Sequence, residues 1–284
     1  MGTKDLTEKV LEAYNDVFAD IVNVLLFDGK KKIKEEDLID ASVHSQYKTS
    51  DNMLHEQERD VSKIWNNCNV KIALLGIENQ TKPEKQMPLR IFGYEGASYR
   101  EQLENVTVYP VVTLVLYFGT DKHWSYGKTI KEVVNIPEEL DEYVNNVKIN
   151  VFEIAWLSDS VIEKFTSDFR IVAKFFSEKR KNKNYIPNDK SIIRHVDAIL
   201  KLLSVMTGDS RYEAILANGH GKGVRNMCDV AERLENKGRI EGKAEGQAEF
   251  VFNMLKAGKS AEQIADFCGL NLLYVKEIEK RLSE

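Results

Sequence analysis

The strongest constraint on the fold is a nearly continuous apolar run, VKIALLGIE, at residues 70–78. An apolar run of strand length without alternation is typical of a strand buried on both faces, so it predicts the centre of a sheet. The run ends in a polar tripeptide, Glu78-Asn79-Gln80. A helix is expected at about residues 86–104, and a second strong strand, YPVVTLVLYFG, at residues 109–119.

The segments before this strand complete a mixed core. Apolar residues recur at helical spacing over residues 5–27, and residues 41–48 alternate as a strand does. Residues 52–66 are ambiguous, because their apolar positions fit a helix while VSKIW at their end also fits a strand; we favour the helix. This order predicts an α/β or α+β fold with one central mixed sheet over residues 1–150.

The character of the chain changes after residue 150. Residues 151–224 are predicted to form a helical extension, and residues 225–284 a long helix with a helical tail. Between residues 170 and 194 there are eight Lys or Arg and two acids, a local charge of +6. Such a stretch is either a solvated face or a surface for phosphate. Its candidates for nucleic-acid contact are Lys179, Arg180, Lys181 and Lys183.

Glycines repeat every four residues in the long helix, at Gly238, Gly242 and Gly246. Each lowers helix stability by about 1 kcal/mol relative to Ala, so the spacing suggests either close approach of a second helix or a hinge. The first reading predicts a homodimer. The tail carries a capping box from Ser260 to Gln263 and a turn at residues 269–271. This spacing is found both in DNA-binding helix-turn-helices and in plain helical hairpins.

Composition excludes several classes of protein. Lys and Arg number 40 against 45 acids, a net charge of -5, which excludes a globally basic protein that coats DNA. Three widely spaced cysteines argue against a disulfide framework. The charged start of the chain and the absence of a long apolar run give no sign of a signal peptide or a membrane span. We therefore expect a cytoplasmic protein without membrane contact.

Polar groups at the end of the buried strand point to metal chemistry. Glu78 and Gln80 share one side of the strand, because strand side chains alternate. Asp60 lies on the element just before this strand, and Asp20 lies on the apolar stripe of the first helix. Gathered carboxylates suit Mg²⁺, which could polarise a phosphate and activate a water molecule. Asp20 could equally be a solvated carboxylate.

Basic residues follow this strand end at once. Lys82 stands two residues after Gln80, and Arg90 and Arg100 lie on the next helix, with Tyr94 on the same side as Arg90. A guanidinium at Arg90 could clamp a phosphate with two hydrogen bonds. The alternative is that Glu78 forms a salt bridge to the neighbouring helix and that Arg90 is its partner.

Several segments resemble the Rpn family, the recombination-promoting nucleases of the PD-(D/E)XK superfamily, which are also labelled transposases. They are NDVFADIVNVLLFDG, ERDVSKIW, IALLGIENQTKPEKQMPLRIFGYEGASYREQL, YPVVTLVLYFG with HWSYGKTIKEV, and GRIEGKAEGQAE. The resemblance implies a restriction-endonuclease-like core, Mg²⁺- or Mn²⁺-dependent cleavage of DNA, and a bacterial setting. It makes Asp60, Glu78 and Gln80 catalytic, Asp60 and Glu78 metal ligands, and Asp20 a recurrent acid of the first helix.

One position departs from the superfamily pattern, because Gln80 stands where a lysine is usual. Gln can hold a water molecule but carries no charge to offset that of a transition state. Either the metal does this alone, or Lys82 or Lys85 helps. Two hypotheses follow: a metal-dependent DNA endonuclease, or a catalytically inactive DNA-binding or assembly protein on a nuclease fold. Action on RNA is a third.

Overall fold

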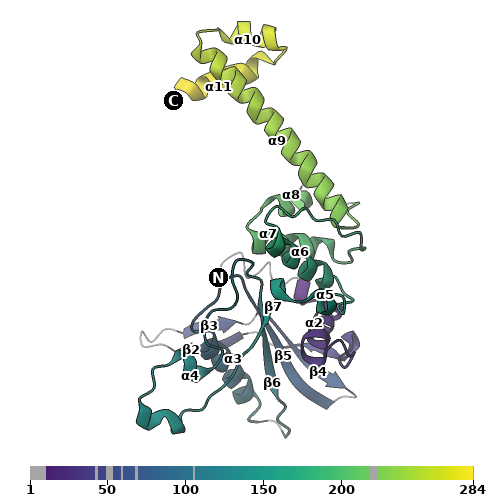
Figure 1. Cartoon of the computed structure of the whole chain (residues 1–284), viewed down its shortest axis with the longest axis vertical. Coiled ribbons are helices and arrows are strands. Elements are labelled where there is room, and N and C mark those ends of the chain that lie inside the picture. The colour runs from purple at the N-terminus through teal and green to yellow at the C-terminus, as the bar shows by residue number, and fades with distance from the viewer. Residues whose placement is uncertain are drawn as a thin grey trace. The chain divides into compact units, whose positions relative to one another are not determined.

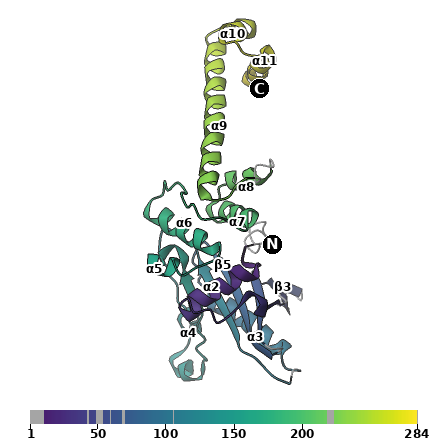
Figure 2. The same ribbon diagram turned by 90° about the vertical axis from the view of Figure 1, so that its right-hand side faces the viewer.

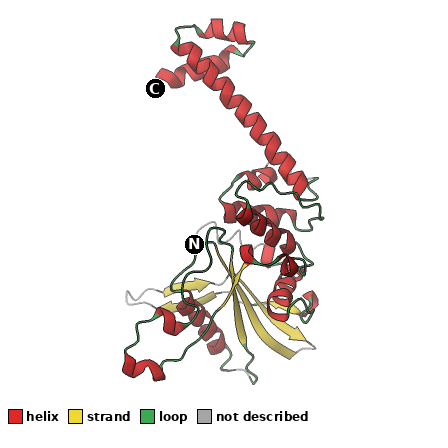
Figure 3. Ribbon diagram, in the orientation of Figure 1, coloured by secondary structure: helices red, strands yellow, loops and turns green. Residues whose placement is uncertain are grey.

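The computed structural model describes residues 11–41, 44–48, 54–58, 60–67, 70–104, 106–217 and 223–283. The chain divides into two compact units, Met1–Cys228 and Asp229–Glu284. The first unit holds the strands and the second is helical (Figures 1 and 3).

The first unit is built on a five-stranded sheet in the order β1-β4-β5-β6-β7. β4 is antiparallel to both of its neighbours, β1 and β5, whereas β5, β6 and β7 are parallel, so the sheet is mixed. The strands are β1 Leu38–Asp40, β4 Val61–Asn67, β5 Val70–Gln80, β6 Val111–Tyr117 and β7 Asn150–Glu153. A separate pair consists of β2 His44–Lys48 and β3 Leu54–Glu58. The predicted mixed sheet is confirmed.

β5 is the central strand, as its apolar run predicts. Leu75 and Ile77 are buried on one of its faces, and Leu74 and Glu78 on the other. The parallel neighbours β5 and β6 need a crossover connection, which contains helix α3, Met87–Glu101. The strand end at Gln80 therefore leads directly to the helix that covers the Glu78 face.

Helices cover both faces of the sheet. On the Glu78 face, Met87, Ile91 and Tyr94 of α3 pack against Val115 and Tyr117 of β6. The other face is covered by α2, Asn15–Phe27, and α6, Phe169–Lys181, which contact each other. Figure 1 has α3 to the left of the sheet and α2 to the right, and Figure 2, seen from that right-hand side, has α2 in front.

The helix favoured at residues 52–66 is wrong, since this segment contains β3 and β4. β4 is hydrogen-bonded on both sides, to β1 and to β5. β5 comes next in the chain, whereas the β1 partners lie at least 23 residues earlier. The hydrogen bonds to these two strands outweigh a sparse helical spacing. The side chain of Lys63 is buried, and its Nζ lies 2.5 Å from Asp40 Oδ1 of β1. A charged residue, which the apolar pattern would place on the surface, is therefore buried in β4.

Two further boundaries differ from the sequence prediction. The first predicted helix, residues 5–27, is interrupted at residues 13–14, and residues 5–10 of it lie outside the described part of the chain. The sheet also continues past residue 150, because β7 pairs with β6. β7 has only four residues, too few to show a period against the helices that follow.

The described part of residues 151–224 is mainly helical, as predicted, apart from β7 at its start, and three short helices lie before residue 150. The remaining elements of the first unit are η1 Glu35–Asp37, α4 Ile130–Val133, η2 Glu138–Tyr143, η3 Ile154–Trp156, α5 Asp159–Ile162, α7 Val196–Thr207 and α8 Arg211–Ala217.

The second unit consists of most of α9, Met227–Lys256, followed by α10, Ala261–Cys268, and α11, Leu272–Ser283. Val251, Ile264 and Val275 form its small core. The predicted capping box is present, because Ser260 Oγ accepts from Gln263 N and Gln263 Oε1 accepts from Ser260 N. Across the described residues, no helix combines the length and the apolar character of a membrane span.

Candidate active site

Asp60 and Glu78 meet at one end of the sheet. β4 and β5 are antiparallel with Val61 opposite Ile77, so Asp60, one residue before β4, falls beside Glu78. Asp60 Oδ2 accepts a hydrogen bond of 2.6 Å from the backbone N–H of Asn79. The two side chains are 7% and 1% exposed. Burying two carboxylates together is costly unless cations or hydrogen bonds compensate them.

Arg90 supplies positive charge at Glu78. It lies on α3, the helix above this face, and its Nη2 forms an ion pair with Glu78 Oε1. Its Nη1 donates to Glu84 Oε2 at 3.0 Å and its Nε donates to the hydroxyl of Tyr94 at 3.0 Å. The salt bridge that the sequence offered as an alternative reading of Arg90 is therefore present. Glu84 is a partner that sequence reasoning missed.

The protonation states follow from burial and from these neighbours. Burial raises the pKa of the Tyr94 hydroxyl, and the negative charges of Glu78 and Asp60 raise it further. For Arg90, burial acts to lower the pKa, but the charge of Glu78, with Tyr94 and Glu84, more than offsets this and the pKa is raised. Near neutral pH Arg90 is thus a fixed cation and Tyr94 a neutral hydroxyl.

Gln80 completes the motif at the last position of β5. Its Nε2 donates to Glu78 Oε1 over 3.4 Å, so the amide lies on the same side as the carboxylate. The alternation expected from the sequence is present. Among the described residues, the cation paired with Glu78 within 4.0 Å is Arg90 and not a lysine.

The donor atoms fit a hard divalent cation in chemical type. Mg²⁺ is usually bound by one or two protein carboxylates and keeps several water molecules. Asp60 and Glu78 supply two buried carboxylates at one point of the sheet. In the described part of the chain, no three His, Cys, Asp or Glu side chains gather as a potential metal site. An ion here would have two acidic ligands, and Glu78 would exchange its contact with Arg90 for the metal.

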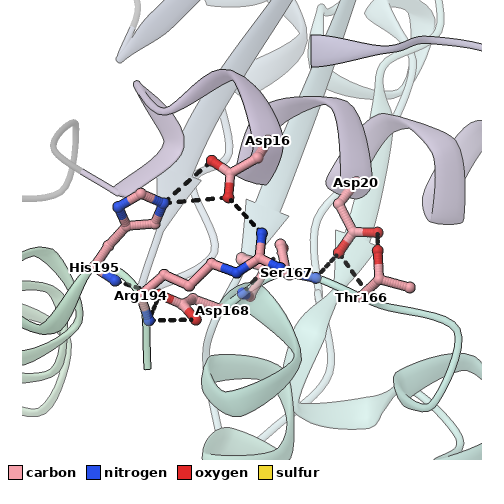
Figure 4. A network of polar contacts seen from close by, with 8 residues as sticks. Asp16, Asp20, Thr166, Ser167, Asp168, Arg194 and His195 are labelled. Atoms are coloured by element: carbon pink, nitrogen blue, oxygen red, sulfur yellow. Dashed lines mark hydrogen bonds and ion pairs between the residues drawn. The ribbon is translucent and has the colours of Figure 1, made fainter. Parts of the chain in front are cut away.

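Asp20 has different contacts. It lies on α2, where its Oδ2 accepts from the backbone N–H groups of Thr166 and Ser167, both at 2.8 Å, and its Oδ1 accepts from Thr166 Oγ1 at 3.1 Å (Figure 4). These bonds tie α2 to the segment before α6. The hydrogen bonds observed for Asp20 thus connect it to the helical extension, whereas Asp60 and Glu78 lie together at the end of the sheet.

A second connection lies beside it in Figure 4 and was not found from the sequence. His195 Nε2 lies 3.2 Å from both carboxylate oxygens of Asp16, and its ring stacks on Tyr14 at 3.8 Å. Asp168 accepts from the backbone N–H groups of Arg194 and His195. The partners of these bonds are up to 179 residues apart, which is why no local pattern predicts them.

The predicted basic residues separate into two groups. Arg180 stacks on Trp156 and donates to Ala155 O at 2.8 Å, and Lys181 pairs with Glu178 and Asp159. The remaining positions are more open: Lys183 lies 3.6 Å from Asp121, Arg100 is exposed at the end of α3, and Lys82 and Lys179 line one cavity.

Comparison with known proteins places the chain in a family. A family model described as "Putative transposase, YhgA-like" matches residues 27–206, which is 180 of 284 residues. The matched segment contains every strand of the sheet together with Asp60, Glu78 and Arg90. No curated protein and no solved structure matches the chain. The chain therefore belongs to the YhgA-like transposase family, which confirms the Rpn-type resemblance of its sequence.

Proposed function

We propose that this protein is a metal-dependent DNA endonuclease that hydrolyses phosphodiester bonds in the recombination or movement of mobile elements. The observation that carries the proposal is the pairing of two buried carboxylates, Asp60 and Glu78, at one end of the central strands. The description of the family as transposase-like supports DNA as the polymer and a link to mobile elements.

The residues have distinct roles in this proposal. Asp60 and Glu78 would hold Mg²⁺ or Mn²⁺, and such an ion would polarise the phosphate and lower the pKa of a water molecule. Gln80 orients the attacking water by hydrogen bonds, since its amide both donates and accepts. With Glu78 engaged by a metal ion, Arg90 would face the negative charge that develops on the phosphate. Arg90 would then supply the positive charge that a lysine at position 80 supplies in the superfamily pattern.

The test is nicking of supercoiled plasmid in Mg²⁺, Mn²⁺, Ca²⁺ or EDTA. We expect nicking in Mg²⁺ and Mn²⁺ and none in EDTA. Asp60→Asn and Glu78→Gln keep the shape of each side chain but remove the charge that binds metal, and should lower the rate on the order of a hundredfold or more. Glu101→Gln, an exposed acid at the end of α3, is the matched control and should cut like the wild type.

Thermal melting of each variant separates a lost site from a lost fold. Nicking that survives in folded Asp60→Asn and Glu78→Gln would refute the assignment of the site.

A second function is favoured by one specific observation. Glu78 is 1% exposed and already neutralised by Arg90, and Gln80 adds no charge. An inactive DNA-binding or assembly protein on a nuclease fold has the same features. It predicts DNA binding that weakens with salt and no nicking with any metal.

A further inference from the structure

A cavity of about 510 Å³ opens at the end of β5 in the first unit. It begins at Thr81 and Lys82, the residues directly after Gln80, and reaches the loop after β6 and the helices α6 and α7. The backbone N–H of Phe118 donates to Gln80 O at 2.8 Å, which holds the two strand ends together at this point. Crevices at the carboxyl ends of neighbouring parallel strands are common ligand sites.

Three lysines from different elements line this cavity: Lys82 after β5, Lys122 after β6 and Lys179 on α6. Lys82 and Lys122 are exposed and Lys179 is half-buried. Within the described ranges, none of the three has a carboxylate within 4.0 Å of its ammonium group.

The acids near these lysines are engaged with other cations. Asp121, which also lines the cavity, lies 3.6 Å from Lys183. Asp209 acts on Lys179 from a longer range and is bound by Arg211 at 2.7 Å. The cavity therefore has an excess of positive charge in a chain whose net charge is -5.

The inner wall is apolar. Tyr117, Phe118 and Phe176 contribute to the lining and are themselves almost fully buried. Tyr117 is held by a hydrogen bond from its hydroxyl to Lys122 O at 2.9 Å. An apolar wall below an open group of ammonium groups suits a ligand with an apolar body and several anionic groups.

We infer that this lysine cavity binds the phosphodiester backbone of the DNA strand next to the phosphate held at Asp60 and Glu78. The inference rests on the proposed function for the identity of the polymer. In a duplex each DNA strand carries one phosphate per about 3.4 Å of helix axis. DNA that continues past the end of β5 at Gln80 would therefore bring successive phosphates to the lysines. Sequence reasoning found Lys82 and Lys179 separately, and the fold joins them with Lys122.

The test is fluorescence anisotropy of a labelled DNA duplex in EDTA, where no cleavage occurs, over a series of KCl concentrations. The variant is full-length K82A/K122A/K179A. The control, K30A/K32A/K148A, removes the same three charges from exposed positions outside the cavity. Each lysine that neutralises a phosphate contributes about 0.9 to the slope of log K against log salt. We expect the cavity variant to lose about 2 to 3 units of slope on any sequence, and the control to lose none.

K82R/K122R/K179R keeps the charge and should bind DNA like the wild type, which excludes a simple loss of packing. Equal slopes for the cavity variant and the control would overturn the inference, and so would a wild type that does not bind DNA. A separate measurement tests whether the cavity binds a small phosphate ligand instead of DNA. The melting temperature of the protein is compared between inorganic phosphate or a mononucleotide and NaCl of equal ionic strength. If these stabilise the wild type but not the cavity variant while DNA binding is equal in both, the DNA assignment is overturned.

The binding experiment can succeed or fail independently of the plasmid-nicking experiment. A protein that binds DNA through the lysines but does not nick plasmid with any metal would refute the nuclease and leave the cavity assignment standing.

Discussion

At the residue scale, the environment of Glu78 determines what the site can do. A carboxylate that is 1% exposed needs a counter-charge, and Arg90 provides it from the next helix. Under the proposed function the site would have two states, with Glu78 bound either to Arg90 or to a metal ion. Because Gln80 is neutral, Arg90 would be the residue that keeps positive charge at the site once a metal had taken its place on Glu78.

Arg90→Gln should therefore lower the stability of the fold and increase the stabilisation that Mg²⁺ gives. Removing one partner of a buried ion pair costs roughly 3–5 kcal/mol, and since a third of the Arg90 side chain is exposed we expect about 2–3 kcal/mol. Mg²⁺ should then raise the melting temperature of this variant more than that of the wild type, because it replaces the lost cation.

Arg100→Gln, exposed on the same helix, is the matched control for Arg90→Gln and should stay within about 0.5 kcal/mol of the wild type. Equal metal-induced shifts in the wild type and in Arg90→Gln would contradict the exchange between Arg90 and the metal.

At the element scale, the helical extension is fastened to the sheet unit by polar side chains of α2. Asp20 accepts three hydrogen bonds from Thr166 and Ser167, and Asp16 contacts His195. These contacts hold the start of α6 and of α7 against the first helix (Figure 4). An acid on the core face of a helix is thus explained by donors from a distant segment.

Asp20→Ala should destabilise the protein without stopping its activity. The substitution leaves the N–H groups of Thr166 and Ser167 partly buried without their acceptor, which costs about 1–3 kcal/mol. Chemical denaturation measures this loss, and the plasmid assay at a temperature where the variant is folded measures the rate. Glu139→Ala, an exposed acid, is the control. A folded Asp20→Ala that no longer nicks would show that Asp20 acts in the chemistry.

The elements themselves were predictable where a local pattern is strong. The continuous run of β5, the apolar run of β6 and the capping box of α10 all lie where the sequence places them. β4 was not predictable in this way. Its hydrogen bonds run to β1 and β5, and residues 52–66 alone do not show that these partners are present. The candidate pair Asp60 and Glu78 was proposed from the strand end and the family resemblance, yet their adjacency depends on this pairing.

At the scale of the whole molecule, the sequence predicts a homodimer from the glycine spacing of α9. Within the described part of the chain, a Cβ added at Gly238, Gly242 or Gly246 would meet no atom within 4 Å. This helix face therefore has room for another helix, and the homodimer stays a prediction.

The measurement is the molar mass in solution, which should be twice 32.5 kDa at micromolar concentration. Gly242→Leu should lower this mass towards that of one chain, because a bulky side chain prevents close helix approach. Lys243→Leu adds similar bulk one residue later, on a different side of the helix, and should leave the mass unchanged. A wild-type mass of 32.5 kDa would refute the homodimer.

The sequence alone determined the central strand, the polar motif at its end, the mixed sheet class and the helical C-terminal region. Each of these rests on patterns that act within a few residues: apolar runs, alternation and capping. Only the tertiary structure decided that Asp60 stands beside Glu78, that Arg90 neutralises Glu78, that Asp20 fastens the helical extension and that three lysines share one cavity. The bonds of Asp20 span 146 residues and the lysines come from three separate elements, so no local pattern could bring them together. Arg90 is only 12 residues from Glu78, but a linear pattern leaves both of its roles open, and the position of α3 over the sheet decides between them.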